Sequence, residues 1–218
     1  MNFHIITIFP EMMRPFTEEG ILGRAKNLKK IINIEFHNPR DFAKDSHKTV
    51  DDRPFGGGPG MVLKAHPILQ TVESVLNKLG ARRKKLNAKI IILSPRGKKF
   101  DNKMAKKLAR NYENLILISG RYEGIDARVK KILKAEEVSI GDYVLSGGEI
   151  PAMVIVDAVA RKISGVLGKE ESLEENRVAP EMVYTRPEVL EWHGKNHKVP
   201  KVLLSGNHAK IEEWREKC

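Results

Sequence analysis

Short apolar runs alternate with segments of helical spacing over most of the chain, and this alternation limits the possible folds most strongly. The predicted strands are Phe3–Phe9, Ile31–Phe36, Lys89–Ser94 and Leu115–Ser119. The predicted helices are Gly20–Asn27, His66–Gly80 with Gly80 as a cap, Asp101–Asn111 with Asp101 as N-cap, and a helix that follows Pro151. Strands that alternate with helices predict an α/β fold with a parallel sheet and helices on both faces.

Two glycine-bearing loops follow apolar runs in this pattern. SGRYEG, at Ser119–Gly124, comes after the run LILIS, and SIGDYVLSGGEIP occupies Ser139–Pro151. Glycine adopts backbone conformations that other residues avoid, and proline at position 151 suits the first residue of a helix. Two such loops at the ends of strands predict one small-molecule site between them.

The charge of the chain indicates a polyanionic partner. Of the 218 residues, 39 are Lys or Arg and 28 are Asp or Glu, which gives a net charge of +11. Thirteen of the basic residues fall between Lys78 and Arg110, where Asp101 is the single acid. Charge alone does not distinguish nucleic acid from a membrane surface, but a cluster of this density favours RNA phosphate.

Cysteine content and hydropathy indicate the compartment. The single cysteine, Cys218, leaves no intrachain disulfide, which is typical of a reducing environment. No apolar run is long enough for a transmembrane helix, and the N-terminus lacks the pattern of a signal peptide. We therefore expect a cytoplasmic protein with no membrane partner.

Changes in composition suggest the domain boundaries. Residues 168–179 carry no apolar periodicity and are predicted to form a flexible linker between a main domain, residues 1–167, and a small C-terminal domain, residues 180–218. A helix is expected near Ala209–Lys217, so the C-terminal domain is predicted to be helical. Because about forty residues bury little surface alone, this domain should dock on the main domain or on a partner subunit.

Three motifs do not support the chemistry that they suggest at first sight. GGGPG, at Gly56–Gly60, lacks the spacing of a phosphate loop and does not follow a strand. His193 and His197 are four residues apart but have no suitable third ligand, so no metal site is predicted. Serines next to glycines do not form the GxSxG elbow of a hydrolase.

Seven segments, in one order along nearly the whole chain, resemble bacterial tRNA (guanine-N1)-methyltransferases. They are DDRPFGGGPGMV (Asp51–Val62), ILSPRG (Ile92–Gly97), SGRYEGID (Ser119–Asp126), SIGDYVLSGGEIPAM (Ser139–Met153), DAVARKISGVLG (Asp157–Gly168), YTRPEV (Tyr184–Val189) and KVPKVLLSGNHAKIEEWR (Lys198–Arg215). The resemblance implies an α/β fold of the SPOUT class with a C-terminal trefoil knot, a homodimer, S-adenosylmethionine as methyl donor, and transfer to N1 of guanosine 37 of tRNA.

The resemblance also implies the residues of the site. The donor pocket would be formed by Leu93, Ser94, Pro95, Gly120, Ile140, Gly141, Tyr143, Leu145, Gly147, Gly148 and Pro151. Arg161 would be the cation that stabilises negative charge on guanine O6, and Glu123 a nearby carboxylate. The residues expected to contact tRNA are Asp51, Arg53, Arg186 and His208.

The chain departs from the family pattern at the expected general base. The family linker reads roughly EESLEEDSF, whereas this chain reads EESLEENRV and has Asn176 at the position of the catalytic aspartate. Asparagine does not accept a proton, so either Glu175 is the base, or turnover is weak, or the chain binds tRNA and donor without methylating. Another SPOUT enzyme acting on ribosomal RNA is a further alternative, and magnesium is a candidate requirement for turnover.

Overall fold

The computed structural model describes residues 1–80, 86–167 and 182–217. The chain divides into two compact units, Met1–Gly168 and Lys169–Cys218, and each is considered separately. Within the described residues, no helix combines the length and hydropathy needed to cross a bilayer.

A five-stranded sheet forms the centre of the first unit, and every neighbouring pair of its strands is parallel. Its strands, in the spatial order β2-β1-β6-β5-β7, are Asn33–His37, Asn2–Ile6, Asn114–Ser119, Ala88–Lys99 and Glu136–Ser139. The predicted parallel sheet is therefore confirmed. Strand β7 was not predicted, because its four residues EEVS include two glutamates and show no apolar run.

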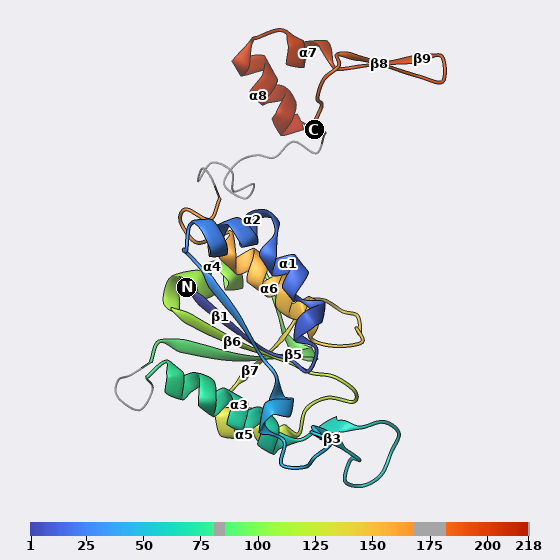
Figure 1. Cartoon of the computed structure of the whole chain (residues 1–218). Helices are drawn as coiled ribbons and strands as arrows, with labels where there is room; N and C mark the ends of the chain where they lie inside the picture. Colours follow the sequence, from blue (N-terminus) through green and yellow to red (C-terminus); the bar gives the residue numbers. More distant parts are fainter. Residues whose placement is uncertain (81–85, 168–181, 218) are drawn as a thin grey trace. The chain divides into compact units, whose positions relative to one another are not determined.

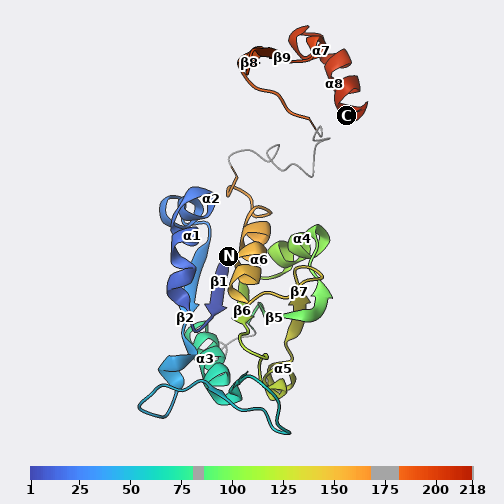
Figure 2. The same cartoon turned by 90° about the vertical axis from the view of Figure 1, so that its right-hand side faces the viewer.

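Helices cover both faces of the sheet, as predicted (Figures 1 and 2). One face carries α1 (Arg14–Glu18), α2 (Gly20–Gly23), α4 (Asn102–Asn111) and α6 (Glu149–Ala160), and the other carries α3 (Ala65–Lys78) and α5 (Ala127–Leu133). The alternation of strand side chains explains the two layers. In β6, Leu115 and Leu117 pack into the first core, whereas Ile116 and Ile118 pack into the second.

Several predicted boundaries are confirmed and others are wrong. The side chain of Asp101 accepts a hydrogen bond from the Met104 amide at 2.6 Å, so Asp101 is the N-cap of α4. Helix α6 begins two residues before Pro151, with Gly148 as its N-cap, so the proline is not at the first position. It is tolerated because amides of the first turn lack intrahelical acceptors. The predicted first strand ends early, at Ile6.

The segment between β2 and α3 is only partly irregular. It contains the 3₁₀ helix η3 (Pro39–Phe42) and a short antiparallel pair, β3 (Asp51–Asp52) with β4 (Val62–Leu63). The predicted helix Gly20–Asn27 is observed as α2 followed by a π-helical turn, η2 (Arg24–Leu28), and η1 (Pro10–Met12) is a further 3₁₀ turn. Residues 53–61, with glycines at positive φ, connect β3 to β4.

The second unit begins with an antiparallel hairpin that sequence analysis did not predict. Strands β8 (Val189–Trp192) and β9 (Lys195–Lys198) are joined by His193 and Gly194, both at positive φ, as a type I′ turn requires. Helices α7 (Lys201–Leu204) and α8 (His208–Lys217) follow. The expectation of a helical C-terminal domain is thus incomplete, because the hairpin is part of this unit.

Candidate active site

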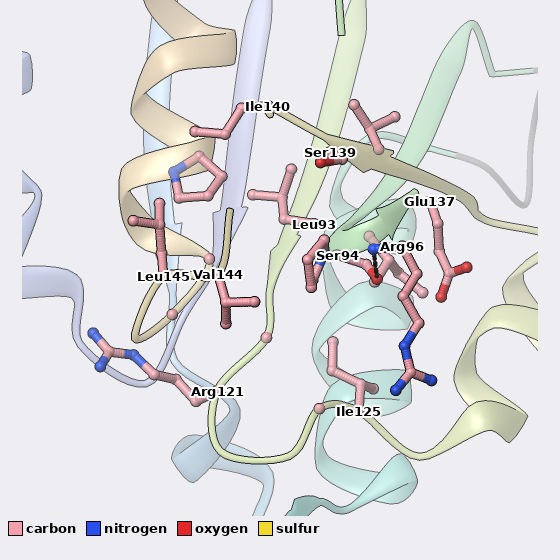
Figure 3. A pocket seen from close by; sticks show the side chains of 18 of the residues that line it. Leu93, Ser94, Arg96, Arg121, Ile125, Glu137, Ser139, Ile140, Val144 and Leu145 are labelled. Carbon is pink, nitrogen blue, oxygen red and sulfur yellow. Dashed lines mark hydrogen bonds between the residues drawn. The ribbon is translucent and has the colours of Figure 1, made fainter. Parts of the chain in front are cut away.

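A pocket of about 690 Å³ lies at the carboxyl ends of β5, β6 and β7 (Figure 3). Its walls come from three segments: the irregular part of β5 around Leu93–Arg96, the loop Gly120–Ala127 after β6, and the loop Ile140–Gly148 after β7. In parallel α/β sheets, ligands bind at the carboxyl ends of the strands. The two glycine-bearing loops singled out in the sequence therefore face one cavity.

An irregularity in β5 produces the first wall. The pairing of β5 with β7 shifts register between Leu93 and Lys98, so the intervening residues leave the regular ladder. Arg96 donates its amide to Ser94 Oγ at 3.3 Å within this bulge. A Cβ at Gly97 would lie 2.4 Å from the backbone nitrogen of Val138, so only glycine allows β7 to approach this closely.

The two loops contact each other directly through their backbones. The Gly148 amide donates to the Gly120 carbonyl at 2.8 Å, and Arg121 forms an isolated β-bridge with Gly147. A Cβ at Gly148 would lie 2.7 Å from Ser119 Cα, which is closer than real Cβ atoms approach backbone atoms. Glycine at this position therefore allows the second and third walls of the pocket to meet.

Tyr143 folds back over its own loop at the pocket wall. A Cβ at Gly141 would lie 2.3 Å from the ring, so the glycine provides the space that the tyrosine occupies. Ser139 Oγ donates to the Gly141 carbonyl at 2.9 Å, and the Gly141 amide donates back to this oxygen at 3.2 Å. This reciprocal pair holds the turn at the end of β7, while the Tyr143 side chain remains half exposed.

A buried ion pair connects the loops with β1, and sequence analysis did not find it. Glu149, 2% exposed, accepts hydrogen bonds from Thr7 Oγ1 at 2.7 Å and from Arg121 Nε at 2.8 Å. The Arg121 guanidinium also lies 4.7 Å from the centre of the Phe9 ring. An acid in the first turn of a helix is usually explained by the helix dipole, so no local pattern indicates a contact with a residue 28 positions away.

Asp126, at the base of the pocket, is held in its ionised form. Its side chain accepts a hydrogen bond from the Arg128 amide at 2.9 Å and caps helix α5. The Arg128 guanidinium donates to both carboxylate oxygens, and this interaction lowers the pKa of Asp126 below its usual value. Asp126 is therefore ionised at neutral pH, and its charge is balanced by Arg128, just as the carboxylate of Glu137 is balanced by Lys130 at 2.7 Å.

The structure brings most of the predicted site residues together. All eleven residues predicted to bind the donor line the pocket: Leu93, Ser94, Pro95, Gly120, Ile140, Gly141, Tyr143, Leu145, Gly147, Gly148 and Pro151. Glu123 lines it as well, together with Arg96, Glu137 and Val144, which were not predicted. Arg161 does not, because it is the C-cap of α6, at the end of the helix opposite Pro151. Glu175 and Asn176 lie outside the described residues.

The predicted tRNA-contact residues fall in both units. Asp51 and Arg53 belong to the β3–β4 hairpin, which contacts the pocket loop: the Glu123 amide donates to the Met61 carbonyl at 3.0 Å. A Cβ at Gly60 would lie 2.6 Å from the Glu123 side chain, so the glycine-rich connection rests against this carboxylate. Arg186 precedes the hairpin of the second unit and His208 begins α8, and both side chains are exposed.

The fold and the pocket define an α/β protein whose small-molecule site is formed by loops at the carboxyl ends of a parallel sheet. Sequence comparison identifies the family. A family model described as tRNA (Guanine-1)-methyltransferase TrmD matches residues 1–218, and the chain belongs to this family.

Two curated relatives that match nearly the whole chain are also named tRNA (guanine-N(1)-)-methyltransferase. A tRNA (guanine-N(1)-)-methyltransferase of Pseudoalteromonas atlantica is 48% identical over 219 residues, which cover 99% of this chain and 78% of the relative. A protein of the same name from Salmonella typhimurium is 50% identical over 221 residues, which cover 100% of this chain and 82% of the relative. The family predicted from the seven sequence segments is therefore confirmed.

Proposed function

We propose that this protein transfers a methyl group from S-adenosylmethionine to N1 of guanosine 37 in tRNA, in the cytoplasm. The observation that carries the proposal is the pocket, since every residue that the family resemblance assigns to donor binding lines one cavity. Family membership and the names of relatives about 50% identical support the reaction class. The position of the guanosine rests on the resemblance alone.

The lining of the pocket suits the proposed donor. Its volume of about 690 Å³ lies within the range of small-molecule sites. Leu93, Leu145 and Pro151 offer apolar contact, and the glycines expose backbone donors and acceptors to a nucleoside. Acidic and basic side chains both line the pocket, among them Asp126, Glu137 and Lys130, and they offer polar contacts to a ligand. When bound, S-adenosylmethionine supplies the electrophilic methyl group, and the protein orients the acceptor.

The acceptor chemistry requires a base and a cation. Guanine N1 carries a proton at neutral pH, and its removal builds negative charge on O6. A guanidinium near O6 stabilises this charge more in the transition state than in the ground state, and Arg161 is the proposed cation. Glu175 is the proposed base, because Asn176 accepts no proton.

Arg161 does not line the pocket of its own chain, so its proposed role calls for a second copy of the chain. It lies ten residues after Pro151, at the other end of α6, which is about 15 Å at 1.5 Å per residue. Ile150 and Val154, 58% and 41% exposed, share a face of α6 with Arg161 because the three are spaced by four and seven residues. We propose that this face forms a two-fold interface in which antiparallel α6 helices bring Arg161 of the partner subunit to the pocket.

Other exposed apolar side chains support the same interface. Met12 in η1 and Phe16 in α1 are 60% and 51% exposed, and α1 covers the same face of the sheet as α6. Scattered apolar residues are normal on surfaces, but several on neighbouring helices are typical of an obligate interface. A homodimer that buries them would explain both their exposure in the single chain and the position of Arg161.

The topology supports the proposed knot. Helix α6 follows edge strand β7, yet it packs against β6 and α4. The chain therefore passes from the edge of the sheet back to its centre, where Gly148 is hydrogen-bonded to Gly120. Passage of residues 140–148 through the loop formed by β5, α4 and β6 is the threading that we propose.

A basic surface offers a place for tRNA phosphates. Exposed lysines and an arginine project from the end of β5 and from α4: Lys98, Lys99, Lys103, Lys106, Lys107 and Arg110. Lys99 is paired with Asp142 at 2.6 Å, so the other side chains are the better candidates. Arg186 and His208 are the tRNA contacts that we propose for the second unit.

Transfer of a radiolabelled methyl group to a tRNA transcript tests the function. We expect one methyl group per transcript, and no transfer when guanosine 37 is replaced by adenosine. Tight binding of the donor without methyl transfer would favour the alternative that the chain binds tRNA and donor but does not methylate. Transfer of the labelled methyl group to ribosomal RNA instead of tRNA would favour another SPOUT enzyme. Omission of magnesium in a parallel reaction tests the ion requirement.

Two further assays separate the proposed base and the proposed dimer. Glu175→Ala should abolish methyl transfer if Glu175 is the base, and Asn176→Asp should accelerate methyl transfer if an aspartate at this position acts as the base.

Chains carrying Arg161→Ala and chains carrying Gly148→Val should each be inactive alone. Mixed dimers should regain activity, because one pocket then receives an intact Arg161. No recovery in verified mixed dimers would contradict a shared site.

A further inference from the structure

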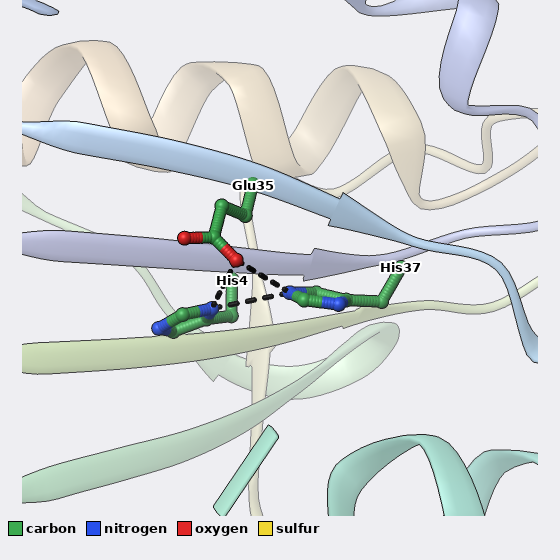
Figure 4. A group of neighbouring side chains, drawn as sticks. All are labelled: His4, Glu35 and His37. Atoms are coloured by element: carbon green, nitrogen blue, oxygen red, sulfur yellow. Dashed lines mark hydrogen bonds and ion pairs between the residues drawn. The ribbon is translucent and has the colours of Figure 1, made fainter. Parts of the chain in front are cut away.

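Two histidines and a glutamate, none of which lines the pocket, converge on two neighbouring strands of the sheet (Figure 4). His4 is on β1, and Glu35 and His37 are on the neighbouring edge strand β2. In the parallel register, His4 is opposite Glu35 and Ile6 is opposite His37. Phe3 and Ile34 pack into the opposite core, so the three polar side chains share the face covered by α3.

The facing atoms of these side chains have the spacing of metal ligands. His4 Nδ1 and His37 Nε2 are 3.1 Å apart, and Glu35 Oε2 lies 4.0 Å from the first and 3.8 Å from the second. A circle through three points with these separations has a radius of about 2.1 Å, which is the usual length of Zn–N and Zn–O bonds. An ion in the plane of the three atoms would contact all of them at this distance, and small rotations of the side chains would bring them around an ion that lies out of this plane and takes a fourth ligand.

The two histidine rings are largely buried, whereas Glu35 is exposed. His4 is 4% exposed, and burial lowers its pKa. Burial, with a smaller contribution from the neighbouring His4, lowers the pKa of His37 to about 4. The exposed carboxylate of Glu35 gives an ion access from solvent.

We propose that His4, Glu35 and His37 bind one zinc ion, which links edge strand β2 to β1. Three protein ligands and one solvent molecule complete a tetrahedral coordination. Each ring carries its proton on the nitrogen that faces away from the ion, so the hydrogen bond between the rings is replaced without net release of a proton. The ion stabilises the sheet at its edge, and methyl transfer does not require it.

Two neighbouring features limit the affinity. His4 Nε2, which carries the proton in the bound form, is buried and has no hydrogen-bond partner among the described residues. A hydrogen-bond partner on the outer ring nitrogen typically raises metal affinity ten- to a hundredfold. Because His4 lacks such a partner, we expect binding that is only micromolar. The Lys78 ammonium, on the last turn of α3, contributes to the lowered pKa of both histidines and therefore repels a cation as well.

Competition with a chromophoric zinc chelator measures the site directly. All chains carry Cys218→Ser, which removes the thiol as an alternative ligand. We expect one zinc ion per chain with micromolar affinity, and at least tenfold weaker binding for Glu35→Gln, which is exposed and should fold normally. His47→Asn and Glu113→Gln, at exposed positions outside the cluster, are matched controls and should bind like the parent.

Two further results test the assignment. Lys78→Gln should tighten zinc binding by roughly threefold, because it removes the opposing charge. Cobalt should give the visible absorption of a four-coordinate site in the parent and in His47→Asn, but not in His37→Asn. Equal zinc affinity of the parent and Glu35→Gln, or no binding by the parent, would overturn the proposal whether or not His37→Asn folds.

Discussion

The buried ion pair between Glu149 and Arg121 is the contact whose loss should change the pocket most clearly. We consider Glu149→Gln, which keeps the size of the side chain. The amide oxygen still accepts from Arg121 Nε, and the NH₂ group donates to Thr7 Oγ1, whose hydroxyl turns away. The substitution therefore removes mainly the negative charge and leaves a guanidinium that is 16% exposed without a counter-charge.

The expected cost follows from this burial. Removal of one partner from a buried pair costs about 3–5 kcal/mol, and the partial exposure of Arg121 lowers this to about 2–3 kcal/mol. For a unit of this size, each kcal/mol corresponds to roughly 2–4 °C, so the melting temperature should fall by roughly 4–12 °C. Because Arg121 and Glu149 connect the two loops, donor affinity should fall about tenfold, equivalent to 1.4 kcal/mol.

Thermal unfolding and calorimetric titration of the donor measure the two effects. Glu113→Gln, the same substitution at an exposed position, is the control and should match the parent. In an Arg121→Met background, Glu149→Gln should cost much less, because the interaction is already lost. Melting of Glu149→Gln within 1 °C of the control, with unchanged donor affinity, would refute the assigned role of the pair.

Three other predictions concern the pocket and its support. Gly148→Ala should weaken donor binding by an order of magnitude or more in titration calorimetry, because its Cβ would lie 2.7 Å from Ser119 Cα, whereas Gly56→Ala places its Cβ in open space and should retain donor binding. Leu117→Ala should lower the free energy of unfolding by about 2–5 kcal/mol in denaturant titration, because the side chain is fully buried. Asp126→Asn should be destabilising at neutral pH, because Arg128 lowers the pKa of the carboxyl group. This difference should disappear as pH falls through the lowered pKa, and a difference that persists there would contradict an ionic origin.

The sheet was predictable because its signals are local. The run LILI, Leu115–Ile118, is apolar at every position and forms the middle of β6, which is buried on both faces. The Asp101 cap was recognisable for the same reason, since its hydrogen bond spans three residues. Strand β7 was missed because an edge strand needs less apolar surface, and Glu136 on it pairs with Lys89 across the sheet.

The residues that line the pocket were largely predictable from the sequence, but the long-range contacts that hold its loops in place were not. The glycines of its loops were visible in the sequence, and the family resemblance assigned them to one cavity. The contact between Thr7 and Glu149 spans 142 residues, so no local pattern encodes it. The cluster of His4, Glu35 and His37 depends on strand register in the same way, since β1 and β2 are separated by the α1–α2 segment.

Donor binding and stability should be coupled through the Glu149 contact, and the coupling has a definite sign. A ligand that binds only the folded protein stabilises it by RT ln(1 + [L]/Kd), about 2.7 kcal/mol at a concentration of 100 Kd. If Glu149→Gln weakens donor binding tenfold, saturating donor should stabilise the variant about 1.4 kcal/mol less than the parent. The difference in melting temperature between them should therefore grow when donor is added. A difference that stays constant would mean that the ion pair supports the fold without shaping the pocket.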